Sequence, residues 1–375
     1  MDCPYCGNKE TLLYFKSRLP GILSACPKKK LSEVKAFPIE VRLCTSCGLG
    51  FNATPLDGNE LKDIYENYLY LSPAHNVGQS IYKDMAEFIR HYCSVEDAIV
   101  EIGCSEGFLL KELNLAGFKR LTGIEPGPQA DVARAAGLSI IKEYFEESTV
   151  KPGSVDVFLL THVFEHFNDP FSMLDSMKKG LSGRGRIIII VPNFSGYHHQ
   201  HLFYYNKFFF QRLCNDKELE IVEMVSTGSE LRCVFAVPSK EDKREKSVKT
   251  FSVEDVISRA RSIQTEFTGK VKKMEDLLAA HNGKTIFWWG AGSASTIILN
   301  QISENLLENT NLIVVDSDRS KKGYFIPGTD LEVRSPDDLH GSEPELVIIA
   351  SSLFREIETT MKQKNIHPSH VEIVY

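Results

Sequence analysis

Residues 99–110 read IVEIGCSEGFLL, an apolar run that ends near an acid and is followed by two glycines and a second apolar run. This pattern is typical of a buried strand that turns tightly into a helix. Glu101 would lie at the carboxyl end of the strand, where an α/β sheet places its ligands, and Gly103 and Gly107 would let the backbone pass close to a ligand. A second acid, Glu125, ends the next apolar run 24 residues later.

The order of these acids and glycines indicates S-adenosylmethionine rather than a dinucleotide. In a dinucleotide fold the strand runs directly into GxGxxG, because backbone N–H groups at the helix start must cradle a pyrophosphate. Here Glu101 comes before the first glycine, where it can receive an ammonium group, and Glu125 suits the two hydroxyls of a ribose. The alternative is an ordinary strand, turn and helix that carries two acids without binding anything.

The composition indicates a globular protein with room for two or three domains: 375 residues, 42% hydrophobic and 25% charged. A net charge of −7 argues against nucleic acid as a partner, because neutralising phosphates needs a basic face. The first residues, MDCPYCG, have no apolar signal region, and no apolar run is long enough to span a membrane. We therefore expect a cytoplasmic monomer or homodimer with no membrane partner.

Four of the nine cysteines form two CxxCG knuckles, Cys3 to Cys6 and Cys44 to Cys47, with 37 residues between them. Each glycine allows backbone amides to turn toward the thiolates, and four thiolates make a closed tetrahedral zinc site with no position left for substrate. We therefore predict a structural Zn²⁺. A redox role for either CxxC is the alternative.

Strands and helices alternate along the rest of the chain, which predicts an α/β fold with a parallel, doubly wound sheet. The expected strands cover residues 98–102, 120–125, 155–160, 186–191 and 231–237, with helices at 81–92, 128–136 and 170–178. After a charged linker we expect a long helix at 253–280 and a second α/β unit with strands at 284–289, 312–315 and 346–350. The predicted domains are residues 1–75, 76–240 and 241–375.

Several motifs follow one another in an order that resembles the nucleotide-sugar C-methyltransferases of deoxysugar pathways. They are CxxC…CxxC, YxYxS, VEIGxxxGxLL, a histidine-rich patch, GSxLR and a C-terminal GAG unit. The resemblance covers nearly the whole chain. It implies a zinc-binding N-terminal domain, a class I methyltransferase core, and a C-terminal Rossmann-like domain that helps to hold a nucleotide-linked ketosugar without binding NAD.

The resemblance also implies roles for single residues. Tyr70 and Ser72 match the connector that contributes to the cofactor site, and Glu101, Gly103, Gly107 and Glu125 match its loop. Ser105 replaces the middle glycine of the commonest loop, and related enzymes carry a small polar residue there. We add His162 to the cofactor-binding candidates. The family lysine near Thr296 is missing, so Lys321 or Lys322 would have to replace it at a diphosphate.

Catalysis is expected in residues 196–206, GYHHQHLFYYN, which follow a predicted strand end. Methylation of a carbon beside a ketone needs a base, stabilisation of the enolate, and alignment with the sulfonium methyl group. The family motif YHEH implies His201 as the base, and His166 matches a second family histidine near the ketone oxygen. His198 replaces the family tyrosine and Gln200 the family glutamate; we expect His198 and His166 to bind the enolate oxygen. Glutamine can orient an imidazole but cannot raise its basicity.

Other interpretations remain open from the sequence. Residues 208–210 with Leu213 fit the apolar face of a helix, and His162, His166 and His199 could be structural; a metal site formed by His198, His199 and His201 lacks fixed spacing. The enzyme could be an O- or N-methyltransferase on a related sugar or polar metabolite. It could also be a zinc-tethered scaffold without activity, or an NAD-linked oxidoreductase, although the GAG unit lacks the third glycine.

Overall fold

The computed structural model describes residues 1–61, 76–194, 197–227, 230–238, 253–351 and 353–374. Tyr70 and Ser72, and the first two residues of the GSxLR motif, lie outside this part of the chain. None of the described helices is both long and apolar enough to cross a membrane.

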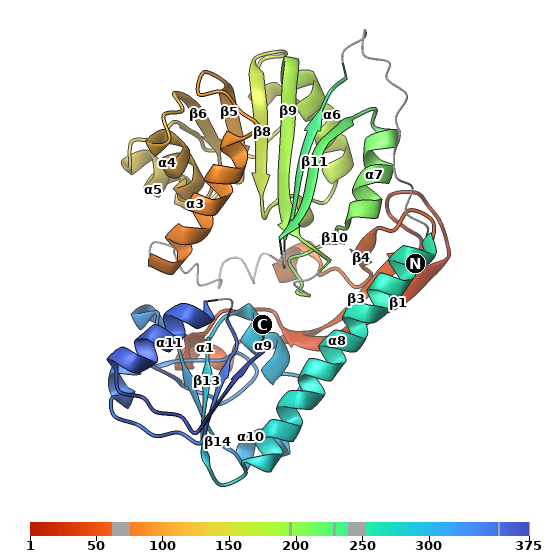
Figure 1. The fold of residues 1–375 in the computed structure, drawn as a ribbon. Helices are drawn as coiled ribbons and strands as arrows, with labels where there is room; N and C mark the ends of the chain where they lie inside the picture. Colours follow the sequence, from red (N-terminus) through yellow and green to blue (C-terminus); the bar gives the residue numbers. More distant parts are fainter. Residues whose placement is uncertain (62–75, 195–196, 228–229, 239–252, 352, 375) are drawn as a thin grey trace.

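The largest sheet has seven strands in the order β11-β12-β9-β8-β5-β6-β7 (Figure 1). In chain order they are β5 (Ala98–Ile102), β6 (Arg120–Ile124), β7 (Ile140–Ile141), β8 (Val155–Thr161), β9 (Leu181–Pro192), β11 (Glu220–Thr227) and β12 (Glu230–Ala236). All neighbours from β7 to β9 are parallel, whereas β12 runs antiparallel to both β9 and β11. The predicted doubly wound sheet is confirmed, but the sheet is not parallel throughout as we expected, because β12 is antiparallel to its neighbours. The edge strand β11 was not predicted.

Helices cover both faces of this sheet because successive side chains of each strand point to opposite faces. One face packs on α6 (Pro170–Gly180) and α7 (Lys207–Asp216), and the other on α3 (Asn76–Arg90) and α4 (Phe108–Leu115); α5 (Gln129–Ala135) packs beside β7. The helix expected around residues 208–213 is confirmed as α7, which buries Phe209, Phe210 and Leu213. Asn206 begins this helix by accepting a hydrogen bond from the Phe209 backbone N–H.

A second sheet combines the N-terminal segment with a piece of the core. Its order is β1 (Thr11–Pro20), β3 (Ala36–Cys44), β4 (Gly50–Asn52) and β10 (Phe203–Tyr204). All of its pairs are antiparallel. Since β10 closely follows the four residues His198 to His201, which we call the histidine-rich patch, the N-terminal sheet and this patch are one continuous structure.

The C-terminal unit is a five-stranded parallel sheet, and its strands at 284–289, 312–315 and 346–350 appear within one or two residues of the predicted bounds. Its order is β16 (Val333–Arg334), β14 (Asn311–Val315), β13 (Thr285–Trp289), β17 (Leu346–Ile349) and β18 (His370–Ile373). The helices are α8 (Val253–Ala280), α9 (Ser293–Leu299), α10 (Glu304–Glu308) and α11 (Phe354–Gln363).

Two elements connect this unit to the N-terminal segment. The long helix α8 runs along β1 and ends beside the C-terminal sheet (Figure 1). The short strand β2 (Cys26–Pro27), followed by α1 (Lys28–Leu31), pairs with β15 (Tyr324–Phe325). Thus the N-terminal segment contacts both α/β units. It shares one sheet with β10 of the methyltransferase core and another with β15 of the C-terminal unit.

Candidate active site

The loop from β5 to α4 has the tight turn that its glycines predict. Gly103 and Gly107 have φ of +74° and +72°. A Cβ atom at Gly103 would lie 2.6 Å from Val163 Cγ2, and one at Gly107 would lie 2.3 Å from Leu138 Cδ1. Both the backbone conformation and the close packing therefore require glycine.

Glu101 ends β5 with a carboxylate that is only 2% exposed. Its Oε1 accepts a hydrogen bond from Thr161 Oγ1 at 3.0 Å, whereas Oε2 has no hydrogen-bond partner among the described residues. Burial raises the pKa of this carboxyl group to about 8, although the Thr161 hydrogen bond opposes the shift. A buried oxygen without a donor is costly, and an ammonium group would satisfy it. The residue therefore fits the amino-acid end of S-adenosylmethionine.

Glu125 lies just after β6 and faces the same loop. Its Oε2 accepts the backbone N–H of Ser105 at 3.0 Å, and its Oε1 accepts that of Gly127 at 2.7 Å. Each carboxylate oxygen has a second lone pair for a ribose hydroxyl. Ser105 has φ of +50°, so this non-glycine residue also takes a left-handed conformation in the loop.

The histidine-rich patch lies at the carboxyl end of β9, as predicted, and β10 holds it in place. Phe203 pairs with Phe51, and the Asn52 backbone N–H donates to the Leu202 carbonyl oxygen at 2.9 Å. Another hydrogen bond, from Asn206 Nδ2 to the Gly48 carbonyl oxygen at 2.7 Å, attaches the start of α7 to the second cysteine knuckle.

Three of the predicted catalytic histidines come together. The ring centroids of His198 and His201 are 3.7 Å apart, those of His166 and His201 are 4.8 Å apart, and those of His166 and His198 are 6.2 Å apart. Burial, with the charges of His166 and His199, lowers the pKa of His198 to about 3. His198 is therefore neutral near pH 7 and offers one ring N–H as a donor.

Gln200 acts through its backbone in this cluster. Its carbonyl oxygen lies 2.9 Å from Nδ1 of His166. Because a carbonyl can only accept, the proton must be on Nδ1, and the lone pair of a neutral His166 is then on Nε2. His166 can donate from Nε2 only as the charged imidazolium.

His199 lies apart from the cluster. It is 1% exposed, its Nε2 lies 3.2 Å from the Leu19 carbonyl oxygen, and its ring packs against Phe37. Burial lowers the pKa of His199. These contacts fit a structural histidine, and the ring nitrogens of His198, His199 and His201 do not gather at the distances of a metal site.

Glu165 is a residue of the cluster that the sequence reasoning missed. It is 1% exposed, and its Oε1 lies 3.7 Å from Nε2 of His201 and 3.9 Å from Nδ1 of His162. Neither carboxylate oxygen accepts a hydrogen bond from the described residues. Glu165, His166 and His201 each bring one nitrogen or oxygen atom within 4.8 Å of the others. The motif HVFEHF, with an acid between two histidines, was the available signal.

His162 connects the cluster to the GSxLR motif. It has φ of +52°, and its Nε2 lies 3.0 Å from Oε1 of Glu230. Glu230 in turn binds Arg232, which also pairs with Asp84 of α3. Burial disfavours charge on His162, but the Glu230 hydrogen bond and the charge of Glu165 outweigh it, so its pKa is raised.

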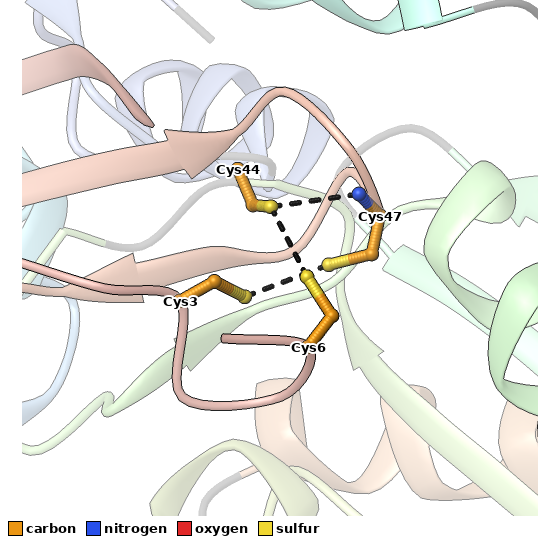
Figure 2. A group of neighbouring side chains, drawn as sticks. All are labelled: Cys3, Cys6, Cys44 and Cys47. Atoms are coloured by element: carbon orange, nitrogen blue, oxygen red, sulfur yellow. Dashed lines mark hydrogen bonds between the residues drawn. The ribbon is translucent and has the colours of Figure 1, made fainter. Parts of the chain in front are cut away.

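The four knuckle cysteines converge as predicted (Figure 2). The Sγ atoms of Cys3 and Cys47 are 3.6 Å apart, and so are those of Cys6 and Cys44. Four thiolates at about 2.3 Å from a tetrahedral zinc ion would lie roughly 3.8 Å apart. The backbone N–H groups of Ser46 and Cys47 point at Cys44 Sγ, at 3.4 and 3.5 Å. The donor set therefore fits a closed zinc site.

The glycine loop of the C-terminal unit is tied to neighbouring side chains. Asp316 accepts the backbone N–H of Ala291 and the Lys321 ammonium group, both at 2.8 Å. Lys322 pairs with Asp338 at 2.6 Å, and Thr296 donates to the Leu23 carbonyl oxygen of the N-terminal segment. Both lysines that we expected near a diphosphate are thus held by acids in this structure.

Two family models match the chain. A "Methyltransferase domain" matches residues 100–189, which include the cofactor loop and the Glu165–His166 segment, and a "C-methyltransferase C-terminal domain" matches residues 226–374. The chain is an S-adenosylmethionine-dependent methyltransferase. The class I fold predicted for the methyltransferase core is confirmed, and no curated protein matches the sequence of this methyltransferase.

Solved structures similar to the methyltransferase include an S-adenosylmethionine-dependent methyltransferase from Aquifex aeolicus, with 14% identity and a TM-score of 0.36 over 43% of this chain and 98% of that one. Another is the magnesium protoporphyrin IX methyltransferase from Synechocystis PCC 6803 with bound S-adenosylmethionine. It is 12% identical, with a TM-score of 0.35 over 49% of this chain and 86% of that one.

Proposed function

We propose that the methyltransferase transfers a methyl group to a carbon beside the ketone of a nucleotide-linked sugar. One observation carries the proposal: the chain runs directly from the cofactor site into the histidine cluster. Thr161, which binds Glu101, ends β8, and Glu165 and His166 follow within five residues. A donor held at Glu101 would therefore lie close to groups that can handle a proton and an enolate.

The side chains of the cluster suit the separate parts of this chemistry. S-adenosylmethionine supplies the methyl group as an electrophilic sulfonium. His201, predicted as the base, takes the proton from the acceptor carbon. The neutral His198 donates a ring N–H to the enolate oxygen, and His166 is the second partner of that oxygen.

The nucleotide would be held by the C-terminal unit, whose sequence matches a C-methyltransferase C-terminal domain. Lys322 is half exposed and its ion pair with Asp338 is at the surface, so a diphosphate can compete for it. Lys321 is much more buried and would have to leave Asp316 first.

The test is deuterium exchange with S-adenosylhomocysteine bound. A thymidine diphosphate-linked ketosugar is added in heavy water, and deuterium entry at the carbon beside the ketone is followed by NMR. We expect entry with the wild type and loss by about 100-fold or more in His201→Ala. His91→Ala, which removes an exposed histidine directly after α3, is the matched control. Methyl transfer without any exchange would instead support an O- or N-methyltransferase.

We also propose that the cysteine cluster holds one structural Zn²⁺ through Cys3, Cys6, Cys44 and Cys47. Elemental analysis should give one zinc per chain, and Cys44→Ser should lose it. Because Gly48 and β4 hold the histidine patch, the same variant should also broaden the NMR signals of His198 and His201. A zinc content unchanged in Cys44→Ser would contradict the proposal.

A further inference from the structure

We propose that Glu165 orients His201 and passes the proton that His201 has taken up to His162, whose side chain is exposed to solvent. The inference rests on the proposed role of His201 as the base. It assigns Glu165 as a positioning and relay residue, and His162 as the proton exit rather than a cofactor ligand.

The reaction requires such an exit. In the transfer, the acceptor C–H bond breaks and its proton goes to His201, while the carbon's electron pair forms the new bond to the methyl group. The S–CH₃ bond breaks, and its electron pair stays on sulfur. Each turnover thus leaves one proton on His201, which is 6% exposed and cannot give it directly to bulk water.

Glu165 is the acid that lies between the base and the surface. The same oxygen, Oε1, is 3.7 Å from His201 Nε2 and 3.9 Å from His162 Nδ1. These separations are longer than hydrogen bonds, and such contacts commonly tighten when ligands bind. The Glu165 backbone is fixed by a hydrogen bond from the Leu202 N–H at 2.9 Å, so the carboxylate and the residue after His201 move together.

A carboxylate at this position also sets the tautomer of the base. With the proton of a neutral His201 on Nε2 toward Glu165, the basic lone pair is on Nδ1. A glutamate in the YHEH motif would also raise the basicity of the imidazole, which the uncharged amide of Gln200 cannot do. Glu165 brings the same chemical group to His201 from the other side.

His162 completes the path. Its side chain is 40% exposed, and its other nitrogen lies 3.0 Å from Glu230, which is held by Arg232. Because the Glu230 carboxylate can only accept, a neutral His162 has its proton on Nε2 and its lone pair on Nδ1, toward Glu165.

Other titratable groups lie beside His201 and Glu165. His166 and His198 pack against the ring of His201, and the Tyr204 ring centroid is 6.0 Å away. Tyr205 is close enough for the charge of Glu165 to add to the effect of burial in raising its pKa.

The first experiment needs no acceptor. In the S-adenosylhomocysteine complex of the full chain, the imidazole Cε1–H signals are titrated by NMR. We expect Glu165→Gln to lower the pKa of His201 by about one unit or more, because a nearby carboxylate favours the imidazolium. Glu165→Asp should restore part of the shift, and His91→Gln should change nothing at His201.

The second experiment distinguishes the role of His162 in proton release from the role of Glu165 in orienting His201. In the deuterium exchange assay, His162→Gln should slow deuterium entry several-fold and leave the pKa of His201 nearly unchanged, and added imidazole buffer should restore the rate. Glu165→Gln should slow entry more strongly. His162 is exposed, so this variant folds even if a Glu165 variant does not.

Three results would overturn the inference: an unchanged His201 pKa in Glu165→Gln, an unchanged exchange rate in His162→Gln, or Glu165-dependent binding of one equivalent of Co²⁺, which would assign the cluster to a metal. If the wild type shows no exchange with the ketosugar, the proposed acceptor is wrong. The His201 titration then still decides whether Glu165 is its partner.

Discussion

The chain contains two glycine loops, each of which follows a buried strand, but the residue two positions before the first glycine differs in chemistry between them. In the methyltransferase core, Glu101 precedes the first loop glycine by two residues; in the C-terminal unit, Trp288 has this position. Glu101 is a buried acid with one oxygen that lacks a partner among the described residues. Trp288 is fully buried and donates its ring N–H to Ser295 at 2.9 Å. The same position thus carries a buried acid in one loop and a hydrogen-bonded aromatic ring in the other.

The acids after the second strand differ as well. Glu125 and Asp316 each accept a backbone N–H from their glycine loop. Asp316, however, also pairs with Lys321, and both side chains are mostly buried. The comparison teaches that a glycine turn with a distal acid can form the same loop in both units. We predict that the residue before the turn, Glu101 or Trp288, decides whether the loop binds a small cationic ligand.

The largest effect is expected at Trp288. Trp288→Ala should lower the free energy of unfolding by about 3–5 kcal/mol, because it empties the core of the C-terminal sheet. Chemical denaturation measures this. The fraction that stays folded should bind S-adenosylhomocysteine like the wild type. A matching loss of affinity would show that the two loops are not independent.

Glu101→Gln should weaken S-adenosylhomocysteine binding by about 2–3 kcal/mol, the typical contribution of a hydrogen bond to a charged group in a buried site. Isothermal calorimetry gives the affinity. Asp316→Asn is the matched control in the other loop and should leave it unchanged. Equal losses in both variants would contradict the assignment of the ligand to the first loop.

The pH dependence should follow the raised pKa of Glu101, about 8 in the ligand-free protein. Only the ionised carboxylate pairs with the ammonium group, so affinity should rise with pH up to about 8, by at most about tenfold per unit. In the absence of ligand the sign reverses: protonated Glu101 favours the folded state at low pH, and this contribution is lost as the pH rises toward 8. Glu101→Gln should flatten both profiles.

Asp316→Asn should have a smaller effect, a loss of about 1–2 kcal/mol in the free energy of unfolding, because it breaks a mostly buried charged hydrogen bond. Asp276→Asn removes one partner of an exposed pair with Lys272 on α8 and should cost less. If Asp316→Asn instead stabilises the protein, the Asp316–Lys321 pair destabilises the fold, and we would then expect it to serve ligand binding.

We expect no effect when NADH is added to the protein. NADH titrated into the protein should leave its own fluorescence unchanged, because Trp288 fills the C-terminal loop and Asp316 is already paired. A saturable change that is lost in Asp316→Asn would revive the oxidoreductase interpretation.

The sequence predicted the two α/β units well because their strands are long apolar runs whose burial does not depend on distant partners. Elements that depend on such partners were missed. β10 has two residues and exists only through its pairing with β4, and β11 is an edge strand with a half-exposed pattern.

The candidate site shows the same limit. The cysteine knuckles and the Glu101 loop are local motifs, so spacing alone predicted that they would form. Glu165 could not be found in this way, because its position beside His201 depends on the contact between two segments 36 residues apart. The backbone role of Gln200 is likewise invisible in a sequence, which reports only the side chain.

The pairing of β4 with β10 has a consequence for how such enzymes diversify. The cysteine-bearing hairpin pairs with the segment that carries the proposed catalytic histidines, so we expect that it cannot be exchanged or deleted as an independent module. Chimaeras that replace residues 1–54 without residues 197–206 should assemble poorly. Those that exchange both together should carry acceptor preference with them.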